Sequence, residues 1–142
     1  MSPHGSTGST PAAVKPRLVV SGTNARTILL GSLVVARATV AAVRALGEDT
    51  TLLAMGSPKG GPGDEDEVCA ELLEARLSGR ELDPDEVRRR VRESRAGQKA
   101  LDPAVEWISA EDLAFAQQID RFDFAMRVAR EGGRLVARTS GT

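Results

Sequence analysis

Four consecutive carboxylates, Asp64 to Glu67, follow a glycine-rich segment and come just before the only cysteine of the chain. Adjacent carboxylates repel one another unless a cation neutralises them or water surrounds them. Carboxylate oxygens are ligands that Mg²⁺ prefers, and this ion commonly takes one or two of them, with water and substrate phosphate as its other ligands. Acids are also favoured at a helix N-terminus by the macrodipole. Two interpretations therefore stay open: a metal site that uses Glu65 and Asp66, or a solvated helix start after a flexible connector.

The glycines before these acids could bring the backbone close to an oxyanion. Gly56 and Gly60 permit such an approach, and Lys59 adds a positive charge beside it. The segment lacks the Gly-Lys-Ser/Thr ending of a P-loop, so a flexible surface loop is an equal alternative. Thr23 and Asn24 follow a predicted strand, where α/β sheets place ligand sites, and a structural turn is the other interpretation of these two residues.

Cys69 falls in the second turn of the predicted helix, three and four residues before Leu72 and Leu73. This spacing favours a small buried hydrophobic residue. A nucleophilic thiol would need an accessible position and a lowered pKa, which the neighbouring acids oppose. The only histidine, His4, lies in a polar N-terminal segment, which argues against a Ser/His/Asp relay and a histidine zinc site.

The composition indicates a cytoplasmic domain without a nucleic-acid or membrane partner. The 142 residues carry 19 basic and 20 acidic side chains, so no net field points to nucleic acid or an anionic membrane. Aromatic residues make up 3%, too few for base-stacking platforms. A single cysteine and the absence of a recognisable signal peptide indicate a reducing cytoplasm, and the longest apolar stretch, 28–43, is interrupted by Arg37.

The order of patterns predicts an α/β domain at 16–142 after a flexible tail at 1–15. Apolar runs at 16–20, 26–34 and 50–56 predict buried strands, and the order strand, helix, strand, loop, helix predicts parallel pairing with a right-handed crossover. Apolar stripes and caps predict helices over 35–46, 64–78, 83–101 and 109–120. The end, 122–139, predicts two strands around a Glu-Gly-Gly turn.

With these segments in order, the chain resembles the 2-phosphosulfolactate phosphatase (ComB-like) family. The family motifs TTNGT and GSLLNA correspond here to GTNAR (22–26) and GSLVVA (31–36). The family pattern AGxxGxxSxEDxxCAG corresponds to MGSPKGGPGDEDEVCAE (55–71), and DLxxCxxxDxxDxVP corresponds to DLAFAQQIDRFDFAM (112–126). The resemblance implies a three-layer α/β/α domain with a mixed, partly parallel sheet.

The chain departs from the family pattern at single positions and at its beginning. The family N-terminal motifs DVLRATT and GNSP have no counterpart here, so the resemblance implies a C-terminal portion that is incomplete on its N-terminal side. The substituted positions, where the family has glycine, asparagine, glycine, cysteine and proline, are Ala25, Val35, Glu71, Ala116 and Met126.

The resemblance implies Mg²⁺-dependent hydrolysis of 2-phospho-3-sulfolactate, or of a related small phosphorylated hydroxy acid, to the hydroxy acid and phosphate. In the family this reaction serves coenzyme M biosynthesis. Glu65 and Asp66 would be metal ligands or the water-orienting base, and Cys69 a wall residue or nucleophile. The phosphate-binding candidates are Thr23, Asn24, Gly56, Lys59 and Gly60.

Two other classes of function remain open at this stage. The substitutions at Ala25, Val35 and Glu71 favour a catalytically impaired remnant or ligand-binding module. An interaction protein could use the arginine-rich segment 83–101, although we expect its arginines to form a solvated face paired with Glu86 and Glu93. A sheet without its N-terminal strands would leave an open edge, which suggests a homodimer or a missing N-terminal half as partner.

Overall fold

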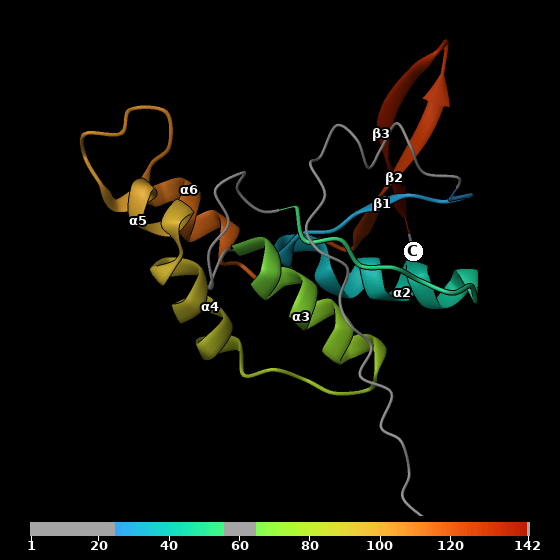
Figure 1. Cartoon of the computed structure of the whole chain (residues 1–142), viewed down its shortest axis with the longest axis horizontal. Coiled ribbons are helices and arrows are strands. Elements are labelled where there is room, and N and C mark those ends of the chain that lie inside the picture. Colours follow the sequence, from blue (N-terminus) through green and yellow to red (C-terminus); the bar gives the residue numbers. More distant parts are fainter. Residues whose placement is uncertain (1–24, 56–64, 142) are drawn as a thin grey trace, which may run out of the picture.

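The structure is a computed structural model that describes residues 25–55 and 65–141. It combines helices with a small sheet (Figure 1), which confirms the mixed α/β class. In chain order the elements are β1 (Leu29–Leu30), the 3-10 helix η1 (Leu33–Val35), α2 (Ala36–Leu46), α3 (Glu65–Leu77), α4 (Pro84–Glu93), α5 (Arg95–Leu101), α6 (Ala110–Ala116), β2 (Phe124–Glu131) and β3 (Arg134–Gly141).

The sheet has three strands in the order β1-β2-β3, and both pairings are antiparallel. β2 and β3 form the predicted hairpin, in which Glu131 pairs with Arg134 around Gly132 and Gly133. Both glycines have positive φ, 54° and 77°, as a two-residue primed turn requires. Figure 1 shows the hairpin projecting from the body of the molecule, so its distal part lies far from the helices.

The predicted parallel pairing is not seen within 25–55 and 65–141, where both strand pairings are antiparallel. The apolar run 26–34 forms a strand only at Leu29–Leu30, because Leu33 and Val35 turn into a helix and become buried, 6% and 1% exposed. Residues 51–55 form no strand, and the predicted strand 16–20 lies outside the described residues. A three-layer arrangement is likewise not seen in the described part of the chain.

The helices begin or end at the glycines and capping residues that the sequence predicted. α2 ends at Gly47 with φ of 62°, and Gly79 after α3 has φ of 74°. Asp83 accepts a hydrogen bond from the Asp85 N–H and so caps α4. Ser109 and Asp112 form a capping box at the start of α6.

The single helix predicted over 83–101 is in fact two helices that meet at Ser94. The Ser94 hydroxyl accepts from the Gly97 N–H at 3.0 Å and caps α5, while its backbone is extended, with ψ of 162°. A Cβ at Gly97 would lie 2.3 Å from the Val91 carbonyl oxygen. The corner therefore requires glycine, because any side chain would collide with the backbone of α4.

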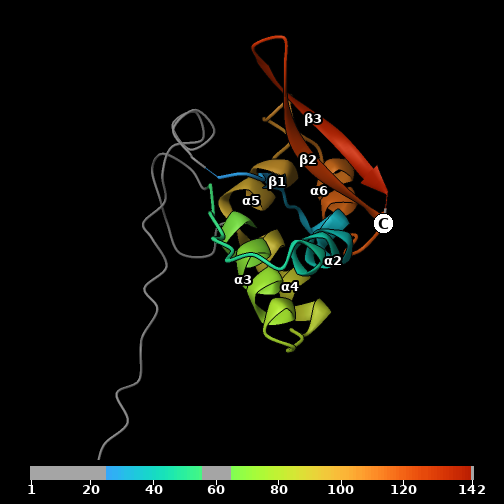
Figure 2. The same ribbon diagram turned by 90° about the vertical axis from the view of Figure 1, so that its right-hand side faces the viewer.

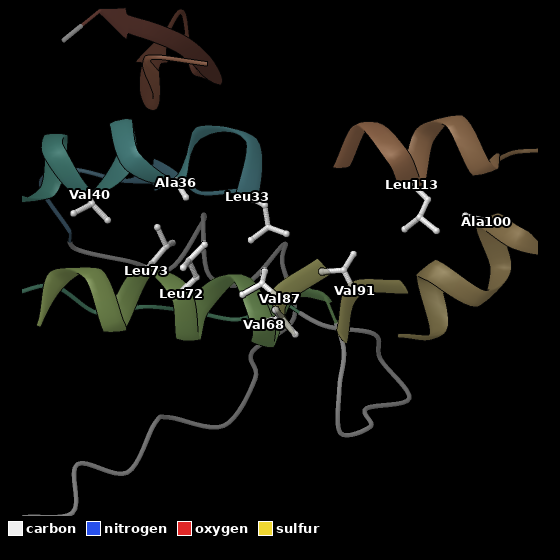
Figure 3. Packing of buried hydrophobic residues seen from close by; sticks show 10 residues of the cluster. All are labelled: Leu33, Ala36, Val40, Val68, Leu72, Leu73, Val87, Val91, Ala100 and Leu113. Carbon is white, nitrogen blue, oxygen red and sulfur yellow. The ribbon is translucent and has the colours of Figure 1, made fainter. Parts of the chain in front are cut away.

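The core lies between the helices, and Figure 2 shows them grouped together with the hairpin rising from them. Residues from η1, α2, α3, α4, α5 and α6 contribute to one buried cluster (Figure 3). Val68 on α3 and Val87 on α4 are 0% and 1% exposed. The cluster comprises Leu33, Ala36, Val40, Val68, Leu72, Leu73, Val87, Val91, Ala100 and Leu113.

Candidate functional site

The first turn of α3 positions two of the predicted metal ligands. Glu65 and Asp66 are half-buried there, whereas Glu67 is exposed. The side chains of these two residues face partly inward, because the buried residues Val68 and Leu72 turn this side of α3 toward the core. The Oε2 atom of Glu65 is excluded from solvent, and both residues take part in interactions with the rest of the chain.

Cys69 lies one turn further along α3 and packs against the hydrophobic cluster. Burial and the negative charge of Asp66 raise the pKa of its thiol to about 12. The thiol is therefore protonated at neutral pH, the opposite of what a nucleophilic cysteine requires. The structure favours the interpretation of Cys69 as a small hydrophobic wall residue.

The carboxylates at the start of α3 fit Mg²⁺ by their chemistry, but only as a partial ligand set. Within 25–55 and 65–141 no three side chains of the types His, Cys, Asp and Glu come together in a way that could hold a metal ion. Mg²⁺ commonly takes one or two carboxylates and completes its octahedron with water and substrate oxygens. Glu65 and Asp66 could supply those two ligands.

The predicted phosphate-binding residues are not placed by the structure. Thr23 and Asn24 lie before the first described residue, and Gly56, Lys59 and Gly60 lie in the segment 56–64, which is also outside the described residues. The structure thus brings together Glu65, Asp66 and Cys69 on one helix start.

Two positions that depart from the family pattern have structural roles in this chain. Val35 is 1% exposed and lies in the core. Glu71 accepts two hydrogen bonds from the Arg90 guanidinium, at 2.5 and 3.0 Å, and so joins α3 to α4. The Arg90 hydrogen bond lowers the pKa of the Glu71 carboxyl below its ordinary value. Both residues therefore contribute to this fold.

A further carboxylate, Asp120, joins three segments of the chain. Its Oδ1 atom accepts from the backbone N–H of Arg37 at 2.7 Å and from Arg76 Nη1 at 2.8 Å. Burial opposes ionisation of Asp120, but the hydrogen bonds and charges of Arg76 and Arg37 outweigh it and lower the pKa of the carboxyl. The sequence analysis did not single out this residue. Asp120 has φ of 59°, a conformation that Asp tolerates better than most residues.

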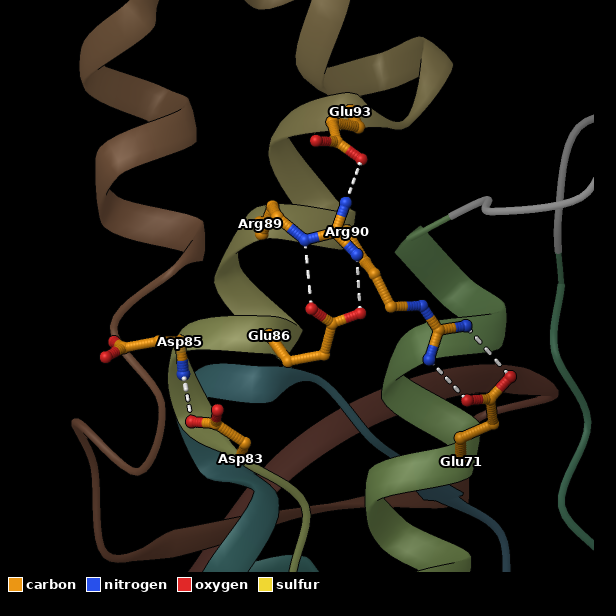
Figure 4. Close-up of polar contacts among 7 residues, drawn as sticks. All are labelled: Glu71, Asp83, Asp85, Glu86, Arg89, Arg90 and Glu93. Atoms are coloured by element: carbon orange, nitrogen blue, oxygen red, sulfur yellow. Dashed lines mark hydrogen bonds and ion pairs between the residues drawn. The ribbon is translucent and has the colours of Figure 1, made fainter.

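Three of the arginines of α4 form ion pairs within the chain, and one of them, Arg89, has the predicted partners. Arg89 contacts both Glu86 and Glu93, and Arg90 reaches across to Glu71 (Figure 4). Arg88 pairs with Asp85. These contacts are largely exposed, so each contributes little stability, but they leave this face of α4 balanced in charge.

The described residues also surround an open cavity of about 410 Å³. It lies at the C-terminal ends of α2 and α3, where its lining includes Val43, Leu52 and Glu74. The cavity is thus at the opposite end of α3 from Glu65 and Asp66.

Comparison with known proteins gave no relative: no family model, no curated protein and no solved structure matches this chain. Among the helices of the described ranges, none combines the length and the apolar character that crossing a bilayer would need.

Proposed function

We propose that this chain is the C-terminal portion of a Mg²⁺-dependent phosphoric monoester hydrolase of the 2-phosphosulfolactate phosphatase kind. The observation that supports the proposal is the position of Glu65 and Asp66, half-buried in the first turn of α3, directly after the glycine-rich segment. The order of the four sequence motifs adds to this support. The substrate in this proposal is 2-phospho-3-sulfolactate or a related small phosphorylated hydroxy acid.

In this proposal the residues of the chain divide the work by their chemistry. Glu65 and Asp66 would hold Mg²⁺, or one of them would orient the attacking water. When bound, the ion would supply charge neutralisation at the phosphoryl oxygens. Lys59 and the backbone amides near Gly56 and Gly60, together with Thr23 and Asn24, would donate hydrogen bonds to the phosphate. Cys69 forms an apolar wall behind the two acids, since its protonated thiol carries no charge.

The rest of the proposed enzyme would come from sequence upstream of this portion. That part would add parallel strands and complete a three-layer α/β/α domain with a mixed sheet. The single cysteine of the chain fits a protein of the reducing cytoplasm. The partner in the reaction is a small phosphorylated anion.

Phosphate release from 2-phosphosulfolactate with and without Mg²⁺ tests the proposal, on this chain alone and on the chain supplied with the upstream part of a family member. We expect Mg²⁺-dependent release that Glu65→Gln or Asp66→Asn lowers at least a hundredfold, an effect typical of losing a group that acts in the transition state. Glu67→Gln is the matched control, because Glu67 is exposed in the same turn and should leave the rate unchanged. No release under either arrangement would refute a phosphatase.

The second candidate is a ligand-binding module that has lost catalysis. The integration of Val35 into the core and of Glu71 into the Arg90 ion pair favours it, because both replace residues of the family pattern with residues that serve the fold. This candidate predicts that Mg²⁺ together with phosphate raises the melting temperature without any turnover. Turnover by the chain would exclude it, and so would a melting temperature that neither ion changes.

A further inference from the structure

The outer edge of β3 is open along its whole length in the described structure. β3 is the last strand in the order β1-β2-β3, and its eight residues pair only with β2. Because Glu131 and Arg134 close a two-residue turn, this pair exchanges both of its hydrogen bonds, and hydrogen-bonded pairs then alternate along the hairpin. The odd-numbered residues of β3 therefore direct their N–H and C=O groups outward, toward the open edge.

The two faces of the hairpin differ in character. Met126 and Val128 lie opposite Thr139 and Ala137, and Leu135 is 40% exposed on the same face. The other face of the distal hairpin carries charged residues, among them the ion pair of Arg138 with Glu131 at 2.7 Å. This mainly apolar face also carries Arg130, opposite Leu135, and Met126 and Val128 on it are half-buried. Leu135 and Ala137 are exposed beside the open edge, and an open strand edge is a template for pairing with another strand.

We propose that β3 pairs with β3 of a second copy of this chain, antiparallel and across a two-fold axis at Ala137. A two-fold axis normal to the sheet keeps the apolar faces of both copies on one side, and it places outward-directed residues opposite one another. The result is a continuous six-stranded sheet with the apolar face extended across both copies.

Charge fixes the register among the alternatives. With the axis at Ala137, Leu135 lies opposite Thr139 of the partner copy, and Arg138 lies opposite Val136. An axis at Val136 would set Arg134 against Arg138 twice, and an axis at Arg138 would set that residue against itself, which like-charge repulsion disfavours. The remaining registers that keep the faces aligned and avoid these contacts overlap over fewer residues of β3.

Disulfide trapping tests the pairing and its register together. In Ala137→Cys the two thiols would stand on a hydrogen-bonded pair with Cα atoms about 5.5 Å apart, within the range of a disulfide. We expect oxidised glutathione to link this variant into a dimer. Thr139→Cys is the matched control, because its two copies would be separated by about 14 Å along the strands and should not link. The wild-type chain controls for Cys69, which is half-buried and should also stay unlinked.

A second variant, Ala137→Pro, tests the interface without an added thiol. Proline removes the outward N–H, which β2 does not use, so the hairpin should survive while the dimer loses two hydrogen bonds at its axis. Analytical ultracentrifugation should show a wild-type dimer and a monomeric variant, with urea midpoints that confirm a folded variant. A monomeric wild-type chain, or linking of Thr139→Cys in place of Ala137→Cys, would overturn the proposal. Pairing of β3 with the segment 16–20 of its own chain would give such a monomer.

Discussion

Replacing Asp120 by Asn removes one negative charge but keeps one acceptor oxygen and the tolerance for φ of 59°. The charge-assisted hydrogen bonds at 2.7 and 2.8 Å are then weakened. Hydrogen bonds to charged groups contribute about 1.5–3 kcal/mol each. Arg76 and Asp120 are 14% and 17% exposed, so solvent screens the pair little, but Arg76 keeps a second partner in Glu81. We therefore expect the free energy of unfolding to fall by about 2 kcal/mol.

The effect should depend on pH in a defined direction. The folded state lowers the pKa of Asp120 below its ordinary value of 3.8. The ionised carboxylate therefore stabilises the fold fully at pH values above the pKa that Asp120 has in the unfolded chain. This contribution is lost as the pH falls through the pKa of the folded state. The difference between wild type and Asp120→Asn should be constant from pH 7 to about pH 5 and should shrink below about pH 4.

Urea unfolding at a series of pH values measures both effects. With a slope of about 1–3 kcal/mol per molar for a small protein, the midpoint of the variant should lie about 1 M lower at pH 7. Asp85→Asn is the control, since Asp85 forms an exposed pair with Arg88 and should change stability by about 0.5 kcal/mol or less. Equal midpoints for Asp120→Asn and wild type at pH 7, or a difference that persists unchanged in acid, would refute the reasoning.

Three further predictions concern α3 and the α4–α5 corner. The Cys69 thiol, with its pKa raised to about 12, should react with an alkylating reagent at pH 8 at least a hundredfold more slowly in the folded chain than in urea, and equal rates would contradict its burial. Gly97→Ala should lower the free energy of unfolding, measured by urea unfolding, by about 3 kcal/mol, because its Cβ would meet a carbonyl oxygen at 2.3 Å. Gly133→Ala, with open space around its Cβ, should lower it by only about 1 kcal/mol. Similar values for the two variants would argue against a steric requirement at the α4–α5 corner. Glu71→Gln should cost about 0.5 kcal/mol at pH 7, since the side chain is half exposed, and a loss several times larger would show that its pair with Arg90 is not a surface contact.

Local signals in the sequence predicted most of the helices and the hairpin. The capping residues Asp83 and Ser109 and the glycines 47, 132 and 133 act through backbone geometry and hydrogen bonds within a few residues, so their effect can be read without the tertiary structure.

The strand predictions failed where an apolar segment could be buried either as a strand or as a helix. The apolar run 26–34, which contains Leu33, fits a buried strand or a buried helix equally well, and packing against α3 decided for the helix at Leu33. The sequence did not predict the break between α4 and α5 at Ser94, because Ser94 and Gly97 lie within a helical pattern. The close approach of Gly97 to α4 explains the break. For the candidate site, the acids of α3 were placed correctly on a helix start, whereas the ion pair of Asp120 with Arg76 spans 44 residues and has no local signal.

The Asp120 contact also has a consequence for the order in which the chain folds. The hydrogen bond from the Arg37 N–H to Asp120 joins residues 83 positions apart, and closing a loop of that length costs about 4 kcal/mol of chain entropy. The β2–β3 hairpin, by contrast, closes over two residues and can form within about 1–10 microseconds. The helices and the hairpin should therefore form first and the Asp120 contact last, so that Asp120→Asn accelerates unfolding and leaves the folding rate nearly unchanged.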